Sequence, residues 1–264
     1  MSAEPAASRY TTKLIKASAL IPDTRALLQA WNLAQDTAEN LARVRRQNLF
    51  GKASRSRVED ILQIFRQRYF SDPDVGRALV ILAQAGAPDA WLVPLFYFFS
   101  AQNDRTLRDV VLETVLPRRA AGYADVDLSH VERQLHQWIA ESQTTTAWAE
   151  ITVKRVAQNG MATLRDFGVL RGDINKEIAA LHLPVEPAAF IAYWLSAREG
   201  SGYGVLHSPE WQLFFLSVDG VERTLIQAQQ QHLLTYQSLG SVIRLDFFAD
   251  SMEGYARVLA ARLS

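Results

Sequence analysis

The stretch from Ala149 to Leu170, "AEITVKRVAQNGMATLRDFGVL", decides how the chain is interpreted. Its Asn159-Gly160 pair is a common turn signal, so the stretch forms either one helix or two. The residues on one helical face keep their phase through the glycine: Ala149, Val153, Val156, Gly160, Leu164 and Phe167. We therefore predict one helix with Gly160 on its buried side, at a propensity cost of about 1 kcal/mol relative to Ala. Gly168 is its expected C-terminal stop, and the Thr144–Thr146 run its expected N-cap.

Helical periodicity dominates on both sides of this stretch. We predict an all-α, mainly helical fold in which helix-turn-helix and winged-helix-like units are joined by a helical bundle, with at most a few short strands. After Gly168, the residues "VLRGDINKEIAAL" are expected to form a short strand and a wing. Residues 241–247, "SVIRLDF", alternate like a strand, although the sequence does not indicate its partner.

Three consecutive segments follow from the pattern: a basic helix-turn-helix-like head over 1–70, a helical connecting bundle over 71–142 and a winged-helix-like half over 143–264. In the head we expect helices from Pro22 or Asp23 to about Gln35, and over 37–49. A third helix is expected to run from Ser56 to about Tyr69, because Ser56 and Glu59 match a capping box.

Composition indicates a folded protein with an uneven charge distribution. The chain has 264 residues, of which 48% are hydrophobic and 21% charged, unlike a disordered chain or a coiled coil. Its formal net charge is zero, yet residues 1–70 hold twelve Lys and Arg against six Asp and Glu. The remainder holds sixteen against twenty-two. A basic end of this kind favours a polyanionic partner.

Several functional classes are disfavoured by the sequence. The absence of cysteine excludes disulfides, thiolate metal sites and cysteine nucleophiles, and fits a reducing compartment. The first residues, "MSAEPAASRYTTK", lack the apolar region of a signal peptide, so we expect a cytoplasmic protein. The apolar stretch 77–102 is interrupted by Gln84, Gly86, Pro88 and Asp89, which predicts two buried helices and no membrane partner.

No active site emerges from the motifs. The five histidines contain no pair at the i, i+4 spacing of a helical metal site, and neither a phosphate-binding loop nor a nucleophile elbow is present. The "GSGYG" run at Gly200–Gly204 follows a helix, so we interpret it as a mobile loop rather than a dinucleotide site. Asp125 and Asp127 fit solvated turn carboxylates. We expect no catalytic residue, cofactor or metal, and no enzyme.

The run "RVRRQNLFGKASRSR" at 43–57 carries six cations and no carboxylate. Wound as a helix, its first part directs Arg43 and Arg46 outward and Arg45 into the apolar sector, so Arg45 is expected to be structural. Lys52 and Arg55 fall in the turn, and Arg57 at the first position of the next helix. Cations there are unfavourable unless an anion such as phosphate shares the site. The plain alternative is a solvated basic loop with surface ion pairs.

A second candidate surface lies on the helix of the opening stretch. Lys154, Arg155 and Gln158 lie opposite its apolar stripe, with Arg165 further along. Gln can read base edges and the cations can hold phosphates. Both candidates therefore predict contact with nucleic acid.

Three segments together resemble the BrxA family, a component of the BREX bacteriophage-exclusion systems of bacteria. They are "NLFGKASRSRVEDILQIFRQRY" at 48–69, "WAEITVKRVAQNGMATLRDFGVL" at 148–170 and "SPEWQLFFL" at 208–216. The resemblance implies a soluble, mainly helical protein with winged-helix character that binds double-stranded DNA in phage defence, alongside other BREX proteins. It brings no catalytic residues.

We place the DNA contacts by geometry, with the basic stretch first and the helical surface second: Arg43, Arg46, Lys52, Arg55, Arg57, then Lys154, Arg155, Gln158 and Arg165. Binding is expected to be mainly to phosphates, with little sequence preference. The alternatives are a protein-interaction scaffold, in which the arginines meet an acidic partner, and an RNA-binding helical module.

Overall fold

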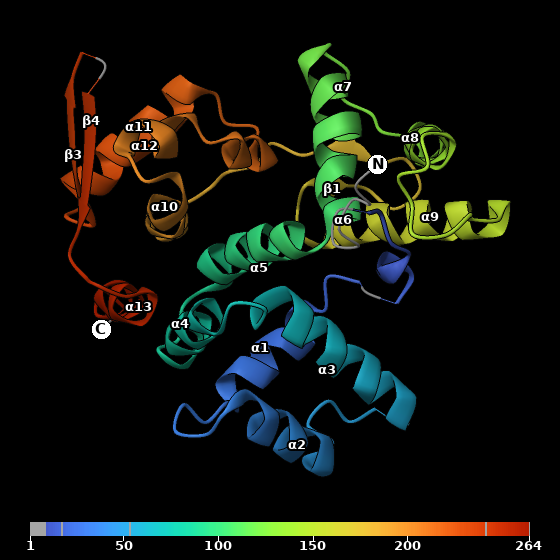
Figure 1. Cartoon of the computed structure of the whole chain (residues 1–264), viewed down its shortest axis with the longest axis horizontal. Coiled ribbons are helices and arrows are strands. Elements are labelled where there is room, and N and C mark those ends of the chain that lie inside the picture. Colours follow the sequence, from blue (N-terminus) through green and yellow to red (C-terminus); the bar gives the residue numbers. More distant parts are fainter. Residues whose placement is uncertain (1–8, 17, 53, 241, 264) are drawn as a thin grey trace, which may run out of the picture. The chain divides into compact units, whose positions relative to one another are not determined.

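The computed structural model describes residues 9–16, 18–52, 54–240 and 242–263, and within them the fold is mainly helical (Figure 1). The predicted fold class is confirmed, because strands form only two small antiparallel sheets of two strands each in the described residues. The helices are η2 (Lys13–Ile15), α1 (Ile21–Gln29), α2 (Thr37–Gln47), α3 (Arg55–Tyr69), α4 (Pro73–Gln84), α5 (Asp89–Asn103), α6 (Arg105–Val110), η3 (Val111–Val115), α7 (Leu116–Ala120), α8 (Leu128–Ala140), α9 (Glu150–Asp166), α10 (Val185–Glu199), α11 (Gly202–His207), η4 (Pro209–Phe214), α12 (Val218–Gln230) and α13 (Met252–Ala260). The strands are β1 (Leu170–Arg171), β2 (Glu177–Ile178), β3 (Leu234–Leu239) and β4 (Val242–Phe247).

The chain forms two compact units, each built from separated parts of the sequence. Among the described residues, the first unit takes those up to Ile21 together with Tyr97–Leu181. The second takes Pro22–Phe96 and the residues from His182 onward. Each of the three segments expected from the sequence, 1–70, 71–142 and 143–264, is thereby shared between the two units. The division into three domains stays a prediction.

In the first unit, α8 and α9 pack together and β1 and β2 follow α9 as a hairpin. The long helix α9 confirms the prediction that Asn159-Gly160 does not break it. Gly160 is buried, and Leu14 of η2 packs opposite it, within van der Waals reach of a Cβ built on the glycine. Gly168 has φ +81° and ends the helix as expected. The expected Thr cap is wrong, because Ala149 is the N-cap residue and the buried Thr144 instead forms a β-bridge with Tyr10.

The helix 105–120 contains a π-helical segment, η3, between α6 and α7. Pro117 lies in the first turn of α7 and has no N–H to donate to the preceding turn. The π-helical turn η3 lies directly before this position, where the proline interrupts the regular backbone hydrogen bonds of the helix. The helical segments thus follow one another without a break from Arg105 to Ala120.

The second unit has an aromatic core near its first helices. Trp31 packs on Phe70 with ring centroids 4.3 Å apart, and Phe65 lies 5.3 Å from Phe70. Gly76 leaves room for this core, since a Cβ at that position would come within 2.7 Å of the Phe70 ring. The last helix, α13, packs on α4, where Glu253 pairs with Arg77. These contacts join the two separated chain segments that form the second unit.

The C-terminal part of this unit adds a hairpin to a group of short helices. Strand β3 pairs with β4 in antiparallel register, with Tyr236 opposite Leu245. The predicted strand at 241–247 is thus observed from Val242, and Ser241 lies outside the described residues. The loop expected at Gly200–Gly204 is wrong, because α11 begins at Gly202 with Ser201 as its N-cap. Glycine is required there since a Cβ would come within 2.5 Å of the Ile243 carbonyl oxygen.

Two helix boundaries in the head differ from the prediction. α1 ends at Gln29 rather than near Gln35, because the buried Asn40 binds the following loop: its side chain accepts from the Asn32 N–H at 2.8 Å and donates to the Asn32 carbonyl at 2.9 Å. α3 is capped by Ser54 rather than Ser56, so it begins at Arg55. The capping box of this region lies instead at Asp36 and Glu39, at the start of α2.

The apolar stretch 77–102 forms parts of α4 and α5, separated by a turn. Among the helices of the described residues, none combines the length and the apolar character needed to cross a bilayer.

Candidate nucleic-acid interface

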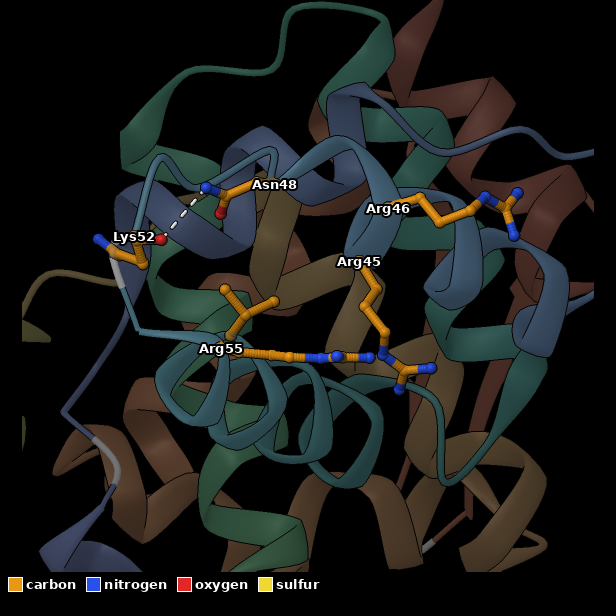
Figure 2. A pocket seen from close by; sticks show the side chains of 6 residues that line it. Arg45, Arg46, Asn48, Lys52 and Arg55 are labelled. Atoms are coloured by element: carbon orange, nitrogen blue, oxygen red, sulfur yellow. Dashed lines mark hydrogen bonds between the residues drawn. The ribbon is translucent and has the colours of Figure 1, made fainter.

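The basic stretch forms the turn between α2 and α3 in the second unit (Figure 2). Asn48 closes α2 in the left-handed conformation, with φ 45°, and its Nδ2 donates to the Lys52 carbonyl at 3.1 Å. Gly51 also has a positive φ, +58°, so the chain reverses tightly here. The turn brings the end of α2 next to the start of α3.

Arg43 does not point outward, so this part of the prediction is wrong. It is half-buried, and its Nη2 donates to the Ala30 carbonyl at 2.6 Å and to Asn40 Oδ1 at 2.8 Å. The reason is that α2 turns Asn40 and Val44 inward, and Arg43 lies beside Asn40 against the end of α1. Arg43 thus binds the backbone that follows α1.

Arg45 is exposed, so its expected place in the apolar sector is wrong, but it is paired as expected of a structural residue: its Nη2 donates to Glu59 Oε2 at 2.8 Å. Lys52 is also paired, with Nζ 3.2 Å from Asp23 Oδ1. Arg57 is half-buried at the third position of α3, not at the first, and its N–H donates to Ser54 Oγ. Arg46 and Arg55 are exposed, and neither has an ion-pair partner within the described part of the chain. Of the five predicted contacts in this turn, these two offer the most available charge.

The second predicted surface lies on α9 in the first unit. Lys154, Arg155 and Gln158 are all exposed, on the side opposite the buried Val153 and Val156. No ion pair is found for either cation among the residues described. The structure thus brings together three of the four predicted side chains of this surface, near the first half of the helix.

Arg165, the fourth, is held by carboxylates. Its Nη1 lies 2.9 Å from Asp173 Oδ1 and its Nη2 2.9 Å from Asp166 Oδ1. These hydrogen bonds, that to Asp166 first, raise the pKa of Arg165. Arg165 therefore joins the end of α9 to the β1–β2 turn, and its charge is largely neutralised.

A third extended segment completes the sheet beside α9. Asp125 forms an antiparallel bridge with Glu177, and the Val126 N–H donates to the Lys176 carbonyl at 2.9 Å. The order along the chain is therefore an extended segment at 124–126, α8, α9, β1 and β2, and β2 lies between β1 and the extended segment. Sequence reasoning missed the first segment, because a single bridge leaves no alternating pattern.

The β1–β2 turn is internally braced. Lys176 is 8% exposed, and its Nζ donates to the carbonyls of Asp173 at 2.8 Å and Gly172 at 3.2 Å. Burial lowers the pKa of this lysine. With Lys176 turned into the hairpin, the tip presents Ile174, which is 94% exposed.

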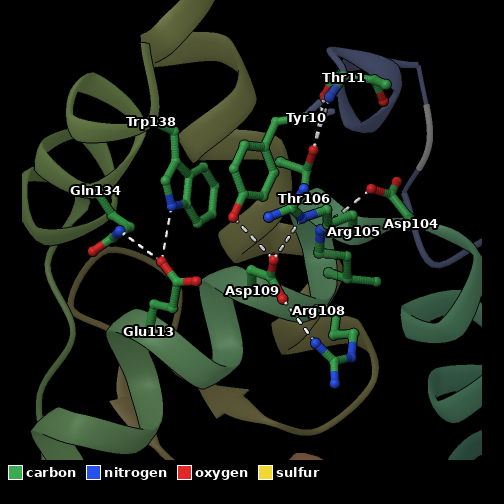
Figure 3. A network of polar contacts seen from close by, with 11 residues as sticks. Tyr10, Thr11, Asp104, Arg105, Thr106, Arg108, Asp109, Glu113, Gln134 and Trp138 are labelled. Atoms are coloured by element: carbon green, nitrogen blue, oxygen red, sulfur yellow. Dashed lines mark hydrogen bonds and ion pairs between the residues drawn. The ribbon is translucent and has the colours of Figure 1, made fainter. Parts of the chain in front are cut away.

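A polar network that no sequence motif indicated holds the loop between α8 and α9 (Figure 3). Tyr10 donates to Asp109 Oδ2 at 2.9 Å, and the same oxygen accepts from Arg105 at 3.0 Å. The backbone of Tyr10 pairs with the loop, donating to the Gln143 carbonyl and accepting from the Thr145 N–H. Long-range pairing of a short segment produces no periodicity, so no sequence pattern indicated it.

Glu113 of η3 anchors α8 in the same region. Its Oε2 accepts from Trp138 Nε1 at 2.8 Å and from Gln134 Nε2 at 2.9 Å (Figure 3). The carboxylates of Glu113 and Asp109 thus accept hydrogen bonds from other residues of the first unit. Among the described residues, no group of three or more His, Asp or Glu side chains is arranged to hold a metal ion.

The family model BrxA matches residues 8–193, well over half of the chain. The chain belongs to the BrxA family. Membership of BrxA places it in BREX phage defence. None of the curated proteins matches the sequence.

One similar solved structure is a crystal structure of an uncharacterized protein from Magnetospirillum magneticum. It is 14% identical, with a TM-score of 0.60, over 73% of this chain and 95% of the other. At this identity the likeness shows a shared fold. The BrxA match ends within α10, so α11, α12, both strands of the second hairpin and α13 lie beyond it.

Proposed function

We propose that this BrxA-family chain is a double-stranded DNA-binding component of a BREX system, and that it binds duplex mainly through phosphates with little sequence preference. The observation that carries the proposal is the exposed set Lys154, Arg155 and Gln158 on α9, whose two cations have no ion pair within the part of the chain that the structure describes. The opposite face of α9 is buried in the first unit, so this set is presented on a rigid element. A rigid helix with free cations is suited to a nucleic-acid groove.

The elements around α9 support the same proposal. An extended segment, two packed helices and a two-stranded hairpin follow one another in the order of a winged helix. In helix-turn-helix proteins the second helix enters the major groove and its N-terminal residues contact bases. Lys154, Arg155 and Gln158 lie in the first half of α9. The β1–β2 hairpin then corresponds to the wing.

The residue types on this face favour phosphate contact over sequence reading. Two of the three are long cations, which contribute a sequence-independent and salt-dependent affinity. Gln158 is the one side chain of the set able to bond an adenine bidentately. A single side chain that contacts base edges gives the protein little preference for any DNA sequence. The function proposed is binding without catalysis, in company with other BREX proteins.

The test is the salt dependence of duplex binding. Affinity for a random-sequence duplex is measured by fluorescence anisotropy over a series of salt concentrations, for the native chain and for Lys154→Gln with Arg155→Gln. Each lost phosphate contact is expected to reduce the log–log slope by about 0.9, so the double variant loses about 1.8. The matched control is Arg66→Gln with Arg223→Gln, which removes the same charge from exposed positions of the second unit.

Two further titrations separate the alternatives. Tighter binding of duplex RNA or single strands than of duplex DNA would favour an RNA-binding module. Absence of duplex binding at low salt would contradict the proposal and leave the protein scaffold as the better explanation.

A further inference from the structure

Residues of α2, of the following turn and of α3 line a pocket of about 380 Å³ in the second unit, which is open to solvent. This volume lies in the range of sites that take small molecules, about 300–1,000 Å³. The lining residues are Arg45, Arg46, Asn48, Lys52, Arg55 and Val58. Four of these six are cationic and none is acidic.

The positive charge of this pocket is only partly compensated by the chain. Glu59 and Asp23, the partners of Arg45 and Lys52, are not among the residues that line the pocket. Arg46 and Arg55 have no carboxylate partner within the described residues. Bringing four cations to one opening is costly unless an anion joins them.

The start of α3 adds to the demand for an anion. The first turn of this helix contains no acidic residue, and its first residue is Arg55. The N-terminus of a helix carries a partial positive charge, which favours carboxylates or phosphates and disfavours cations. The sequence thus places a cation where helices usually place an acid.

The pocket lining offers guanidinium groups that are able to form a bidentate contact. In Figure 2 the side chain of Arg55 runs from the start of α3 toward Arg45 of α2, whereas Arg46 and Lys52 extend away from that pair. Guanidinium groups form forked hydrogen bonds with the oxygens of phosphate. Val58, which is 4% exposed, contributes an apolar part to the lining.

We infer that this pocket binds phosphate groups, either those of a DNA backbone or those of a free nucleotide. The inference goes beyond duplex binding by α9, because it assigns a second anion site in the other unit and extends to ligands that are not DNA. Arg55, whose guanidinium has no ion-pair partner among the described residues and is directed toward Arg45, binds the phosphate, and Arg45, Arg46 and Lys52 contribute positive charge.

Inorganic pyrophosphate is the first probe, titrated into the full chain at low ionic strength by isothermal calorimetry. We expect saturable binding that weakens at least tenfold in Arg46→Gln with Arg55→Gln. Arg66→Gln is the matched control, since it removes a charge from the exposed far end of α3 and is expected to leave binding unchanged. Arg55→Lys keeps the charge but loses the fork, so its binding should lie between the two. No saturable binding, or full binding by the double variant, would overturn the inference.

The thermal unfolding temperature of each variant verifies that it folds. Neither Arg46 nor Arg55 makes an ion pair in the described residues, so both substitutions are expected to leave it unchanged. Were the double variant to unfold, the chemical shifts of the arginine side chains of the native chain would decide instead: Arg55 and Arg46 should move on addition of pyrophosphate, and unmoved signals would overturn the inference.

Two competition arms identify the source of the phosphate. If a duplex displaces pyrophosphate, the pocket takes DNA backbone. If ATP binds more tightly than pyrophosphate and a duplex does not displace it, the pocket takes a free nucleotide. Lys154→Gln with Arg155→Gln should retain pyrophosphate binding in both cases. Absence of duplex binding by the native chain, with its pyrophosphate binding intact, would refute the proposed function and leave this inference standing.

Discussion

The ring of Tyr10 stacks on that of Trp138, with centroids 3.7 Å apart and planes 12° from parallel. Above the same tyrosine, the Arg105 guanidinium lies 4.4 Å from the ring centroid. Tyr10 thus contacts α8 through its ring, α6 through its hydroxyl bond to Asp109 and the loop to α9 through its backbone. Tyr10 therefore joins α6, α8 and the loop that precedes α9 within the first unit.

Removing this side chain should destabilise the first unit strongly. Tyr10 is 1% exposed, so we expect Tyr10→Ala to lower the free energy of unfolding by about 3–5 kcal/mol, as for other buried aromatic side chains. Tyr10→Phe keeps the stacking and removes one hydrogen bond to Asp109, which Arg105 and Arg108 still contact, so about 1 kcal/mol is expected. Denaturant unfolding measures both. Tyr123→Phe, at a 57% exposed position, is the control. Equal losses for Ala and Phe at position 10 would argue against the stacking contribution.

Arg43 and Arg46 differ by three positions on α2 and should behave oppositely. Arg43→Ala removes the hydrogen bond to the Ala30 carbonyl and one of the two that Asn40 Oδ1 accepts, so we expect a loss of about 2 kcal/mol of unfolding free energy and little change in anion binding. Arg46→Ala removes an exposed side chain and should change stability by less than about 0.5 kcal/mol while weakening pyrophosphate binding. The two quantities are measured on the same samples. Reversal of this pattern would restore Arg43 as an outward contact.

Buried tyrosines predict a loss of stability at alkaline pH. Burial is the largest cause that raises the pKa of Tyr10, Tyr97 and Tyr255 above their ordinary value of about 10. Each phenol keeps its proton in the folded state, so its stabilising contribution is complete below pH about 10 and falls at higher pH, where the unfolded chain has lost the proton. The expected slope is about 1.4 kcal/mol per pH unit for each tyrosine.

Tyr97→Phe isolates one of these contributions. Its slope of unfolding free energy against pH should be shallower than that of the native chain by about 1.4 kcal/mol per unit between pH about 10 and the folded pKa. The difference between the two proteins cancels the titration of lysines, which both contain. Parallel slopes would contradict a protonated, buried Tyr97.

The mainly helical fold was predictable because helices are encoded locally. The stripe through Val153, Val156, Gly160 and Leu164 has one period, and a single turn signal inside it did not outweigh the phase. Boundaries were less predictable where a buried polar side chain decides them. Asn40 ends α1 early by bonding the loop, and nothing in the local pattern distinguishes it from a solvent-exposed asparagine.

The sequence allowed us to predict which cations are exposed, but not which of them are paired with a carboxylate in the folded chain. Lys154 and Arg155 followed from helical phase, since only their side of α9 was free. Whether a cation is neutralised depends on residues brought near by the fold, as Asp173 is for Arg165 and Asp23 for Lys52. The two units also combine distant parts of the chain, which periodicity does not encode.

The proposed wing depends on the backbone of Gly172, and one substitution tests it. Gly172 has φ +86°, and a Cβ there would lie 2.3 Å from the Asn175 carbonyl oxygen. Gly122 has nearly the same φ, +84°, but a Cβ would meet nothing within 4 Å. Gly172→Ala therefore adds a clash to the left-handed strain, whereas Gly122→Ala adds only the strain, of about 1 kcal/mol.

We expect Gly172→Ala to open the β1–β2 turn, since the clash is with backbone and not with a flexible side chain. Amide hydrogen exchange of Ile178 should accelerate, because its strand partner Leu170 and its bond to the Ala124 carbonyl depend on the hairpin. Exchange within α9 should stay slow in both variants. Duplex affinity should fall in Gly172→Ala and stay near the native value in Gly122→Ala if the hairpin contacts DNA. An opened hairpin with unchanged duplex affinity would show that α9 binds DNA without the wing.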